Sequence, residues 1–362
     1  MNIGLTIIHV IESLALGGAE KSLVQNVNAM PEYKHVVVIL SEPDNLKVNL
    51  KNAEFINLNC STFFQRLMAA RKLREVIISM QPDLVHAQLF NSTLVARRAS
   101  KGKVPFIFTL QSMLGEDLFK KDFISRMMEK LTYAKKNYII AVSNEALNDY
   151  EKYIKVNKTR TKVIYNSIET NFFAQTYKRF TPGHKIKLVA VGNLKPLKNY
   201  DYMFDALRMI DKELVELEVY GDGPHRDFLQ KRIETENLPV VLKGNVSDLD
   251  QRIKHYDIYL HCSKYEGSSL AIFEAMASGL PLIVSDIPVL QENTGGYATY
   301  VDLQDPISLT QKIIAIQKGD LEINTNGQQG FDWVKTVAHP DVVITETLKY
   351  YKKILDENKK PN

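Results

Sequence analysis

The sequence predicts an α/β protein built from two doubly wound parallel sheets. The chain has 362 residues, more than one ordinary domain of roughly 100–200 residues. Short β-branched runs alternate with segments of helical period along almost its whole length. Runs such as 138–142 and 188–192 are continuously apolar, as expected of parallel strands that helices cover on both faces. This alternation indicates repeated strand–helix units wound around open sheets.

The expected elements form two series. In the first series, β-branched runs predict strands at 5–13, 35–40, 54–59, 83–88, 105–111, 137–143 and 162–166. Apolar residues at helical spacing predict helices among them, for example at 19–29, 63–80 and 119–136. The second series predicts strands at 186–192, 215–221, 240–244, 258–263, 281–285 and 297–302.

A polar stretch with a Pro-Gly pair, residues 176–184, lies between the two series. We therefore predict an N-terminal domain over 1–175, a linker over 176–184 and a C-terminal domain over 185–342. Both domains are expected to be Rossmann-like and to face each other across a cleft. The tail, residues 343–362, is predicted to be an amphipathic helix that packs back on the first domain.

Composition excludes several classes of protein. With 45% hydrophobic and 24% charged residues, the chain is neither disordered nor fibrous. Cys60 and Cys262 form no metal-ligand or redox spacing, which argues against a disulfide framework or a thiolate zinc site and suits a reducing compartment. No apolar run reaches the roughly 18–20 residues of a membrane span. The apolar N-terminus lacks a basic start and is interrupted by Glu12, so a cytoplasmic protein is expected.

The segment 263–281 carries the most chemical information. Glu266 lies in the loop at the carboxyl end of a predicted strand, where ligands bind in open α/β sheets. Ser268 and Ser269 are placed to cap the following helix, whose free N–H groups suit a phosphate. Glu274, a little over one turn inside that helix, can accept two hydroxyls of a ribose. The segment therefore offers contacts for a sugar, a phosphate and a ribose.

These residues resemble the donor site of the retaining glycosyltransferases of family 4 (group 1), which have the GT-B fold. The resemblance rests on Glu266-Gly and, after the spacing Glu-x7-Glu, on Glu274-Ala-Met-Ala-x-Gly-x-Pro. Further segments match the family in order along nearly the whole chain: Leu16-Gly-Gly-Ala-Glu20, Ala141-Val-Ser143, Val163-Ile-Tyr-Asn166, Gly192-Asn-Leu-Lys-Pro-Leu-Lys-Asn199 and Tyr220-Gly-Asp-Gly-Pro224. The family implies retaining transfer of a hexosyl group from a nucleotide sugar, here expected to be a UDP-sugar, to a glycan or lipid-linked saccharide in cell-surface polysaccharide or glycoconjugate synthesis.

The resemblance also implies roles for individual residues. Glu266 would contact the sugar and orient its ring, and Lys198 would stabilise the departing diphosphate, so these two are the candidate catalytic residues. Glycines at a strand-to-helix turn let backbone N–H groups approach the phosphates closely. The candidate donor-binding residues are Gly17, Gly18, Gln111, Asn193, Lys195, Gly267, Ser268, Ser269, Leu270 and Glu274.

The family implies no metal cofactor, and the sequence shows no convincing metal site. Asp248-Leu-Asp250 matches the metal motif of a different glycosyltransferase fold. Acidic residues are common at helix starts, so we predict that this segment opens a helix.

Two positions depart from the family pattern. Asn193 stands where the family has Arg, and Gln111 stands where it has His. A neutral amide can neither act as a bidentate guanidinium nor carry a proton. Two alternatives therefore stay open: a nucleotide-sugar-binding partner protein that has lost turnover, and a sugar-nucleotide epimerase on the same fold.

The net charge of +4 conceals an asymmetry, because basic residues exceed acidic ones in the first half and not in the second. The excess is concentrated in 97–136, where Phe119, Phe123 and Met127 have helical spacing, and 63–74 is similar in character. These two segments predict peripheral contact with an anionic membrane. The alternative is an ordinary core stripe with solvated lysines. No basic–aromatic platform accompanies the charge, so nucleic acid is not expected.

Overall fold

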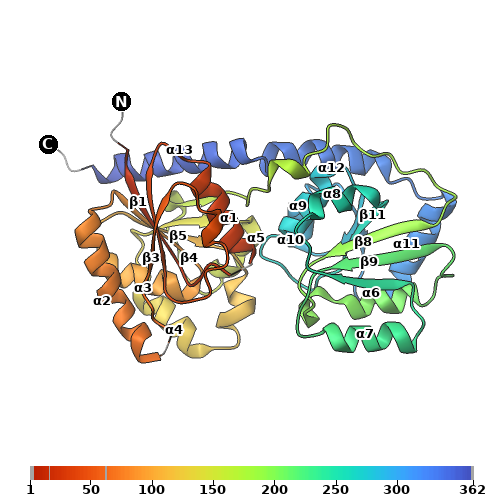
Figure 1. Cartoon of the computed structure of the whole chain (residues 1–362), viewed down its shortest axis with the longest axis horizontal. Coiled ribbons are helices and arrows are strands. Elements are labelled where there is room, and N and C mark those ends of the chain that lie inside the picture. The colour runs from red at the N-terminus through yellow and green to blue at the C-terminus, as the bar shows by residue number, and fades with distance from the viewer. Residues whose placement is uncertain (1–3, 16, 62, 360–362) are drawn as a thin grey trace. The chain divides into compact units, whose positions relative to one another are not determined.

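The computed structural model describes residues 4–15, 17–61 and 63–359, and it divides the chain into two compact units (Figure 1). Unit 1 comprises Met1–Ser167 and Pro340–Asn362, and unit 2 comprises Ile168–His339. Each unit contains a parallel sheet with helices around it. The predicted α/β fold with two parallel sheets is confirmed.

Unit 1 contains a seven-stranded sheet in the order β3-β2-β1-β4-β5-β6-β7. Its strands are β1 (Thr6–Ile11), β2 (Lys34–Ile39), β3 (Ala53–Asn57), β4 (Leu84–Gln88), β5 (Phe106–Leu110), β6 (Tyr138–Ala141) and β7 (Thr161–Val163). Its α-helices in the described residues are α1 (Gly18–Asn28), α2 (Phe63–Met80), α3 (Phe90–Ser100), α4 (Phe123–Thr132), α5 (Asn144–Glu151) and α13 (Pro340–Asn358). The chain thus winds outward from β1 and β4 in both directions, as a doubly wound sheet does.

Both faces of the unit 1 sheet are buried. Neighbouring residues of a strand point to opposite faces of the sheet, so alternate residues show what covers each face. Residues such as Ile8 and Val85 pack with Leu73 of α2 on one face. On the other face, Ile7 and Leu84 pack with buried residues of the C-terminal helix α13. Helix α13 therefore belongs to the core of unit 1 although it is made from the end of the chain.

Unit 2 contains a six-stranded sheet in the order β10-β9-β8-β11-β12-β13. Its strands are β8 (Ile186–Val191), β9 (Val215–Tyr220), β10 (Val240–Gly244), β11 (Ile258–His261), β12 (Leu282–Ser285) and β13 (Thr299–Val301). Its α-helices are α6 (Tyr200–Leu207), α7 (Arg226–Thr235), α8 (Leu249–Arg252), α9 (Leu270–Ala277), α10 (Pro288–Asn293), α11 (Pro306–Lys318) and α12 (Asn324–Val337). Every strand pair recorded in the two sheets is parallel.

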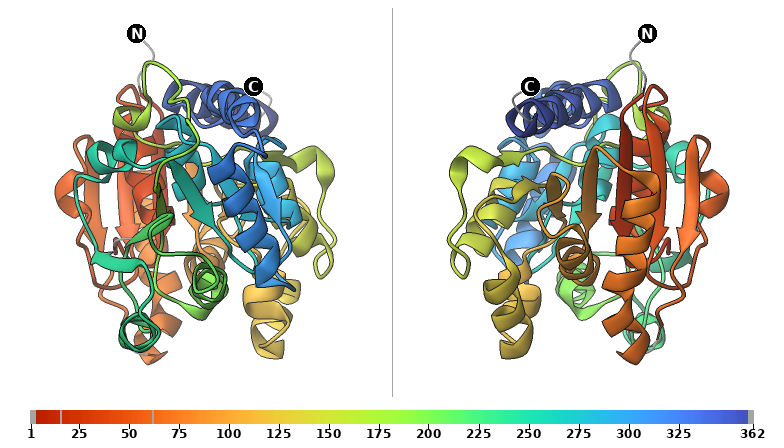
Figure 2. Two further views of the ribbon diagram at one scale, coloured as in Figure 1. Left: turned by 90° about the vertical axis from the view of Figure 1, so that its right-hand side faces the viewer. Right: turned by 90° about the vertical axis from the view of Figure 1, so that its left-hand side faces the viewer.

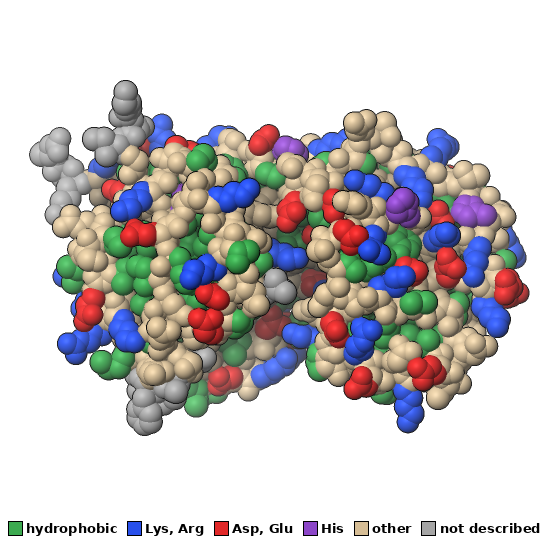
Figure 3. All heavy atoms as spheres, in the orientation of Figure 1, with side chains coloured by type: hydrophobic (Ala, Val, Ile, Leu, Met, Phe, Trp, Pro, Cys, Tyr) green, Lys and Arg blue, Asp and Glu red, His purple; other side chains and the backbone are tan. Residues whose placement is uncertain are grey.

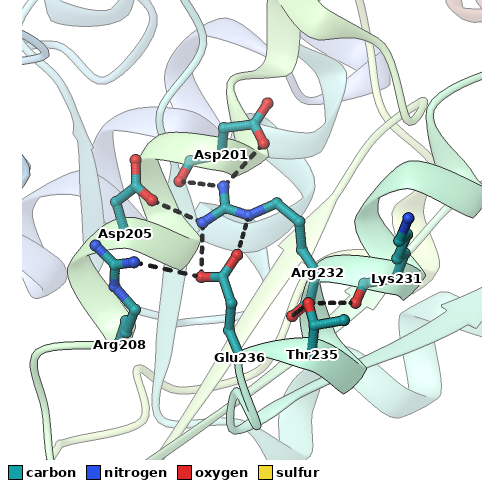
Figure 4. A network of polar contacts seen from close by, with 7 residues as sticks. All are labelled: Asp201, Asp205, Arg208, Lys231, Arg232, Thr235 and Glu236. Atoms are coloured by element: carbon teal, nitrogen blue, oxygen red, sulfur yellow. Dashed lines mark hydrogen bonds and ion pairs between the residues drawn. The ribbon is translucent and has the colours of Figure 1, made fainter.

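A single guanidinium group links two neighbouring helices of unit 2 (Figure 4). Arg232 of α7 donates to Asp201 at 3.0 Å and to Asp205 at 2.7 Å, both on α6. It also donates to both oxygens of Glu236, at 2.6 and 2.9 Å. Only the Arg232 side chain is well covered, at 15% exposure, whereas its partners are 24–40% exposed. This is a surface network, and such networks contribute modestly to stability.

Glycine is required where the loop after β9 passes the loop after β8. Gly221 has φ +136°, and a Cβ there would lie 2.1 Å from the backbone oxygen of Gly192. No side chain fits such a contact. Gly221 thus lets the carboxyl ends of β8 and β9 approach each other.

Two predicted segments differ from the structure. The stretch 176–184 lies inside unit 2, where Phe180 is buried and its backbone N–H donates to Asn324. The division of the chain falls earlier, after Ser167, because the stretch is fastened to unit 2 by such contacts. In place of the predicted helix over 119–136, the structure has a short π-helix, Gly115–Phe119, and then the separate helix α4, Phe123–Thr132.

Candidate active site

Glu266 lies at the centre of a buried polar network in unit 2. It follows β11 in the loop before α9 and is 9% exposed. Lys198 Nζ donates to Glu266 Oε1 at 2.6 Å, and Ser263 Oγ donates to the same atom at 2.7 Å. His261 Nε2 lies 2.9 Å from it. The two candidate catalytic residues, Glu266 and Lys198, are therefore brought together from loops that follow neighbouring strands.

The protonation of this network follows from its partners. Burial alone would raise the pKa of Glu266, but the charge of Lys198 and the hydrogen bonds from His261 and Lys198 lower that pKa to about 2. Burial lowers the pKa of His261, so its imidazole is neutral. An ionised carboxylate only accepts hydrogen bonds, so His261 Nε2 carries the hydrogen. His261 Nδ1 then accepts from the Tyr259 hydroxyl at 3.2 Å.

The three donors meet on one carboxylate oxygen, Oε1. The second oxygen, Oε2, is not part of this network, so the carboxylate is held in place by one atom and can accept a ligand hydroxyl with the other. His261 was not singled out from the sequence, because a histidine within a buried strand has no spacing that separates it from a core residue. Its position five residues before Glu266 becomes informative only once the strand end is known.

The start of α9 follows directly. Ser269 occupies the N-cap position in extended conformation, but its side chain makes no cap hydrogen bond, and Ser268 Oγ accepts instead from Asn293 at 3.3 Å. The predicted side-chain capping by these two serines is therefore wrong, since neither hydroxyl is used in that way. Gly267 and Leu270 flank this turn, with Leu270 the first residue of α9.

Glu274 lies one turn inside α9 and is partly exposed. Burial raises the pKa of the Tyr259 hydroxyl, and the charges of Glu274 and Glu266 act on it in the same direction. Both carboxylates therefore lie close enough to Tyr259 to influence it. The predicted pair of glutamates is brought to one region of unit 2.

The side chains of the two remaining residues of the predicted diphosphate loop make no recorded hydrogen bond to the Glu266 network, although the Lys195 carbonyl accepts from the Lys198 N–H at 3.0 Å. Asn193 and Lys195 follow β8 and are exposed to solvent. A backbone hydrogen bond of 2.8 Å joins the Lys195 N–H to the Asn193 carbonyl. Lys198, farther along the same loop, is the cation that the fold directs at Glu266.

In unit 1 the glycine-rich turn precedes α1. Gly17 is the N-cap residue and Gly18 the first residue of the helix, while Leu16 lies outside the described residues. A Cβ on Gly17 would lie 2.2 Å from a carboxylate oxygen of Glu20. The Glu20 carboxylate therefore lies over this turn at the start of an eleven-residue helix, and the phosphate contact expected of Gly17 and Gly18 stays a prediction.

Gln111 follows β5 and belongs to a chain of neutral hydrogen bonds. Its Nε2 donates to Gln88 Oε1 at 2.9 Å, and its Oε1 accepts from Asn166 Nδ2 at 3.2 Å. Asn166 in turn accepts from Ser22 of α1 at 2.9 Å. Gln88 and Ser22 were missed from the sequence because an amide at a strand end and a hydroxyl within a helix are both common. This series of hydrogen bonds fixes α1 relative to the end of β5.

A cavity of about 210 Å³ adjoins Gln111 in unit 1. Apolar side chains, including Leu89, Phe90 and Phe108, form most of its wall, and Glu12 and Gln111 supply polar groups. It opens at the carboxyl ends of β4 and β5. A cavity of this kind suits a small ligand with one apolar side.

Metal ligands do not converge in the described part of the chain, where no three His, Cys, Asp or Glu side chains form a group. Asp248 is the N-cap residue of α8 and accepts from Arg252 at 2.7 Å, as expected of a helix start. Cys60 and Cys262 are both free and buried. Within the described ranges, no helix is long and apolar enough to span a membrane.

Comparison with known proteins also divides the chain into two parts. The model of "Glycosyltransferase Family 4" matches residues 16–172, and the model of "Glycosyl transferases group 1" matches residues 185–318. Together the two models span most of the sequence.

Similar sequences include bacterial glycosyltransferases. The UDP-Gal:α-D-GlcNAc-diphosphoundecaprenol α-1,3-galactosyltransferase of Escherichia coli is 25% identical over 306 residues, which cover 78% of this chain and 79% of that protein. The GtfA subunit of a UDP-N-acetylglucosamine–peptide N-acetylglucosaminyltransferase from Streptococcus gordonii is 31% identical over 149 residues, 37% of this chain. The chain spans only 29% of that relative's length.

Solved structures share the fold. Anabaena HepE, crystallised in complex with UDP, superposes with a TM-score of 0.79 at 18% identity. The match covers 96% of this chain and 100% of HepE. At this identity the likeness concerns the arrangement of the backbone.

Proposed function

The chain belongs to the family 4 (group 1) glycosyltransferases, and from that premise we propose that it transfers a hexosyl group from a UDP-sugar to a lipid-linked saccharide with retention of configuration. The observation that carries the proposal is the convergence of Lys198, His261 and Ser263 on one oxygen of Glu266. An ionised carboxylate held in this way can orient the sugar. The lysine beside it can stabilise the leaving diphosphate.

The donor and acceptor are inferred from chemistry and from the relatives. Glu274 is assigned to the ribose hydroxyls, and the backbone N–H groups of Ser268, Ser269 and Leu270 are assigned to the diphosphate. The names of the galactosyltransferase and of the GtfA subunit specify UDP-sugars as donors. The galactosyltransferase acts on a diphosphoundecaprenol-linked sugar, which supports a lipid-linked acceptor in cell-surface polysaccharide synthesis.

In the proposed reaction the bond between the anomeric carbon and the diphosphate oxygen breaks while the acceptor oxygen attacks from the same face. The acceptor proton passes to an oxygen of the leaving phosphate, so no separate protein base is needed. Lys198 stabilises the charge that grows on the diphosphate, and Glu266 fixes the sugar ring. The N–H groups at Gly17 and Gly18, with Gln111, Asn193 and Lys195, are assigned to further donor contacts. No step uses a metal.

The test is transfer from UDP-glucose, UDP-galactose and UDP-N-acetylglucosamine to undecaprenyl-diphosphate-linked N-acetylglucosamine, with and without a chelator. We expect one donor to be used, an α-configured product by NMR, and a rate that the chelator leaves unchanged. Glu266→Gln should abolish transfer, whereas Glu213→Gln, at an exposed position of unit 2, should not alter it. A β-configured product would overturn retention.

Asn193 and Gln111 support a second candidate, a nucleotide-sugar-binding protein without turnover. Each is neutral where the family has a basic residue. Calorimetric binding of a UDP-sugar, with neither transfer nor hydrolysis against any acceptor, would favour this candidate over the transferase. An epimerised sugar in NMR spectra recorded without acceptor would instead identify an epimerase.

A further inference from the structure

Helix α4 of unit 1 carries its apolar side toward solvent. Five of the twelve exposed large hydrophobic residues among the described residues lie on this one helix. They are Phe123, Ile124, Met127, Met128 and Leu131, with exposures from 39% to 77%. Their spacing places them on one stripe of the helix. Figure 2 shows α4, in gold, projecting at the lower edge of unit 1.

The polar side of α4 faces inward. Glu129 is 1% exposed, and both of its oxygens accept from the guanidinium of Arg97 on α3, at 2.9 and 3.0 Å. The Tyr150 hydroxyl of α5 also donates to Glu129. Arg97 donates further to Thr132 Oγ1 at 2.9 Å. The helix is therefore attached to the rest of unit 1 largely through charged and hydroxyl groups.

This attachment fixes the rotation of α4 about its axis. Turning the apolar stripe inward would move Glu129 to the surface and leave Arg97 buried without its carboxylate, which is strongly unfavourable. A surface helix of a globular protein ordinarily has the opposite arrangement, with its apolar stripe in the core. The pair of Glu129 and Arg97 thus holds the apolar stripe of α4 toward solvent.

Basic residues flank the stripe in the sequence. Lys120 and Lys121 precede α4, Lys130 lies on it, and Lys135 and Lys136 follow it, all exposed. Of these five, only Lys120 forms an ion pair among the described residues, with Glu116 at 3.1 Å. Figure 3 shows basic and acidic side chains interspersed on the visible faces of both units. Asp122, the N-cap residue of α4, accepts from Ser125 and from the Ile124 N–H. Four of the five lysines therefore form no ion pair among the described residues.

We propose that α4 docks unit 1 onto an anionic lipid bilayer, with its apolar stripe inserted among the acyl chains and the flanking lysines at the lipid phosphates. An outward apolar stripe bordered by lysines has the chemistry of an interfacial helix. The negative charge of the bilayer complements these lysines, which argues for a membrane over a second copy of this basic surface. This inference goes beyond the proposed function, because docking needs neither donor nor acceptor.

The other segment predicted to contact the membrane does not share this geometry. In α2, Ala69, Leu73 and Ile77 face the core, and the side chains of Phe63, Phe64, Arg66 and Leu67 lie outside the described residues. Arg71 is paired with Glu75 at 3.5 Å. Phe119, which the sequence placed on the same stripe as Phe123, is buried in the core of unit 1. Met68 of α2 is 48% exposed, but only on α4 do the described side chains form an exposed apolar stripe, so the proposal concerns α4 and its flanking lysines.

The test is co-sedimentation of the full chain with vesicles of phosphatidylcholine alone or mixed with phosphatidylglycerol. We expect binding to the anionic vesicles, little binding to the neutral ones, and weaker binding at high salt. The double variant Ile124→Ser/Leu131→Ser should reduce binding at least tenfold. A matched variant, Met209→Ser/Phe228→Ser, removes two exposed hydrophobic side chains of unit 2 and should bind as the wild type does.

Because Ile124 and Leu131 are 69% and 77% exposed, their replacement should leave the melting temperature unchanged, which separates lost docking from lost folding. Lys121→Gln/Lys130→Gln should weaken binding to anionic vesicles several-fold. Equal binding by the wild type and Ile124→Ser/Leu131→Ser would overturn the proposal, as would absence of binding by the wild type. A vesicle-free dimer that only this variant loses would assign the stripe to a second copy instead.

Discussion

Two glutamates are almost completely buried next to a cation, Glu129 in unit 1 and Glu266 in unit 2, and their surroundings differ. Glu129 has both oxygens occupied, by the two arms of the Arg97 guanidinium and by Tyr150. Glu266 receives Lys198, His261 and Ser263 on Oε1 alone. Both oxygens of Glu129 thus bond to other parts of unit 1. In Glu266, one oxygen stays outside the network.

This difference separates a structural ion pair from one suited to a ligand. A rigid guanidinium matches a carboxylate with two parallel bonds and fixes a helix. A lysine on a flexible stem makes a single contact and can turn toward an incoming phosphate. The fold therefore uses the same pair of charges to position α4 in unit 1 and to prepare a site in unit 2.

The largest expected effect is on stability in unit 1. Glu129→Gln removes the charge that compensates buried Arg97, so we expect the free energy of unfolding to fall by about 3–5 kcal/mol. Denaturant titration of the full chain measures it. Glu346→Gln, at a partly exposed salt bridge, is the control and should cost less than about 1 kcal/mol. A loss as small as that of the control would contradict the structural role of the pair.

The next effect is on activity in unit 2. Lys198→Gln should lower kcat roughly 10²–10³-fold, because one charged stabiliser of the leaving group is removed. Its side chain is 19% exposed, so the melting temperature should change much less than in Glu129→Gln. If both variants lost stability equally and Lys198→Gln kept its kcat, the distinction between the two pairs would fail.

Acid should weaken the two units in different pH ranges. Burial lowers the pKa of His86 in unit 1 to about 3, and His9 and His35 are shifted in the same direction. The unfolded chain takes up protons on these histidines near pH 6.5, whereas the folded chain does not. The free energy of unfolding is therefore highest above that pH and declines below it. The ionised Glu266, whose pKa is about 2, contributes fully to the free energy of unfolding above about pH 4.5. This contribution declines toward pH 2.

Unit 2 contains one further shifted histidine, His261, against three in unit 1. Hydrogen exchange at pH 7 and pH 5, corrected for intrinsic rates, should therefore show a greater loss of protection in unit 1. His86→Gln should reduce that loss, and His255→Gln, at an exposed position, should not. Equal losses in both units would argue against this assignment.

A smaller effect is expected at His261. His261→Asn keeps a donor near Glu266 but shortens the side chain, so kcat should fall roughly tenfold while KM for the donor changes little. Steady-state kinetics with varied donor separates the two constants. His261→Leu, which removes the donor, should be worse than the Asn variant. Identical rates for both replacements would show that the imidazole only fills space.

The smallest effect is expected at the surface network of Figure 4. Arg232→Gln breaks bonds to three carboxylates, yet their exposure lets water replace the arginine. We expect a loss of about 1 kcal/mol in the free energy of unfolding. A loss as large as that of Glu129→Gln would mean that burial does not explain the contrast between the pairs.

Strands and the Glu266–Glu274 motif were predictable because their signals are local. Each expected strand overlaps one in the structure, since a buried parallel strand must be a short apolar run. The network around Glu266 was predictable only for Lys198, through its motif. The clamp between Arg97 and Glu129 joins residues 32 positions apart, and no local pattern reports such a pairing. The rotation of α4 and the role of His261 therefore required coordinates.

The C-terminal helix α13 bears on how the chain is made. Unit 2 is one continuous segment, whereas unit 1 needs Pro340–Asn362. Tyr351 of α13 bonds to His86 at 2.6 Å, and α13 covers the sheet face that holds Ile7 and Leu84. During synthesis that face stays uncovered until α13 has left the ribosome. Unit 2 can thus complete its fold first, and unit 1 depends until then on protection from aggregation.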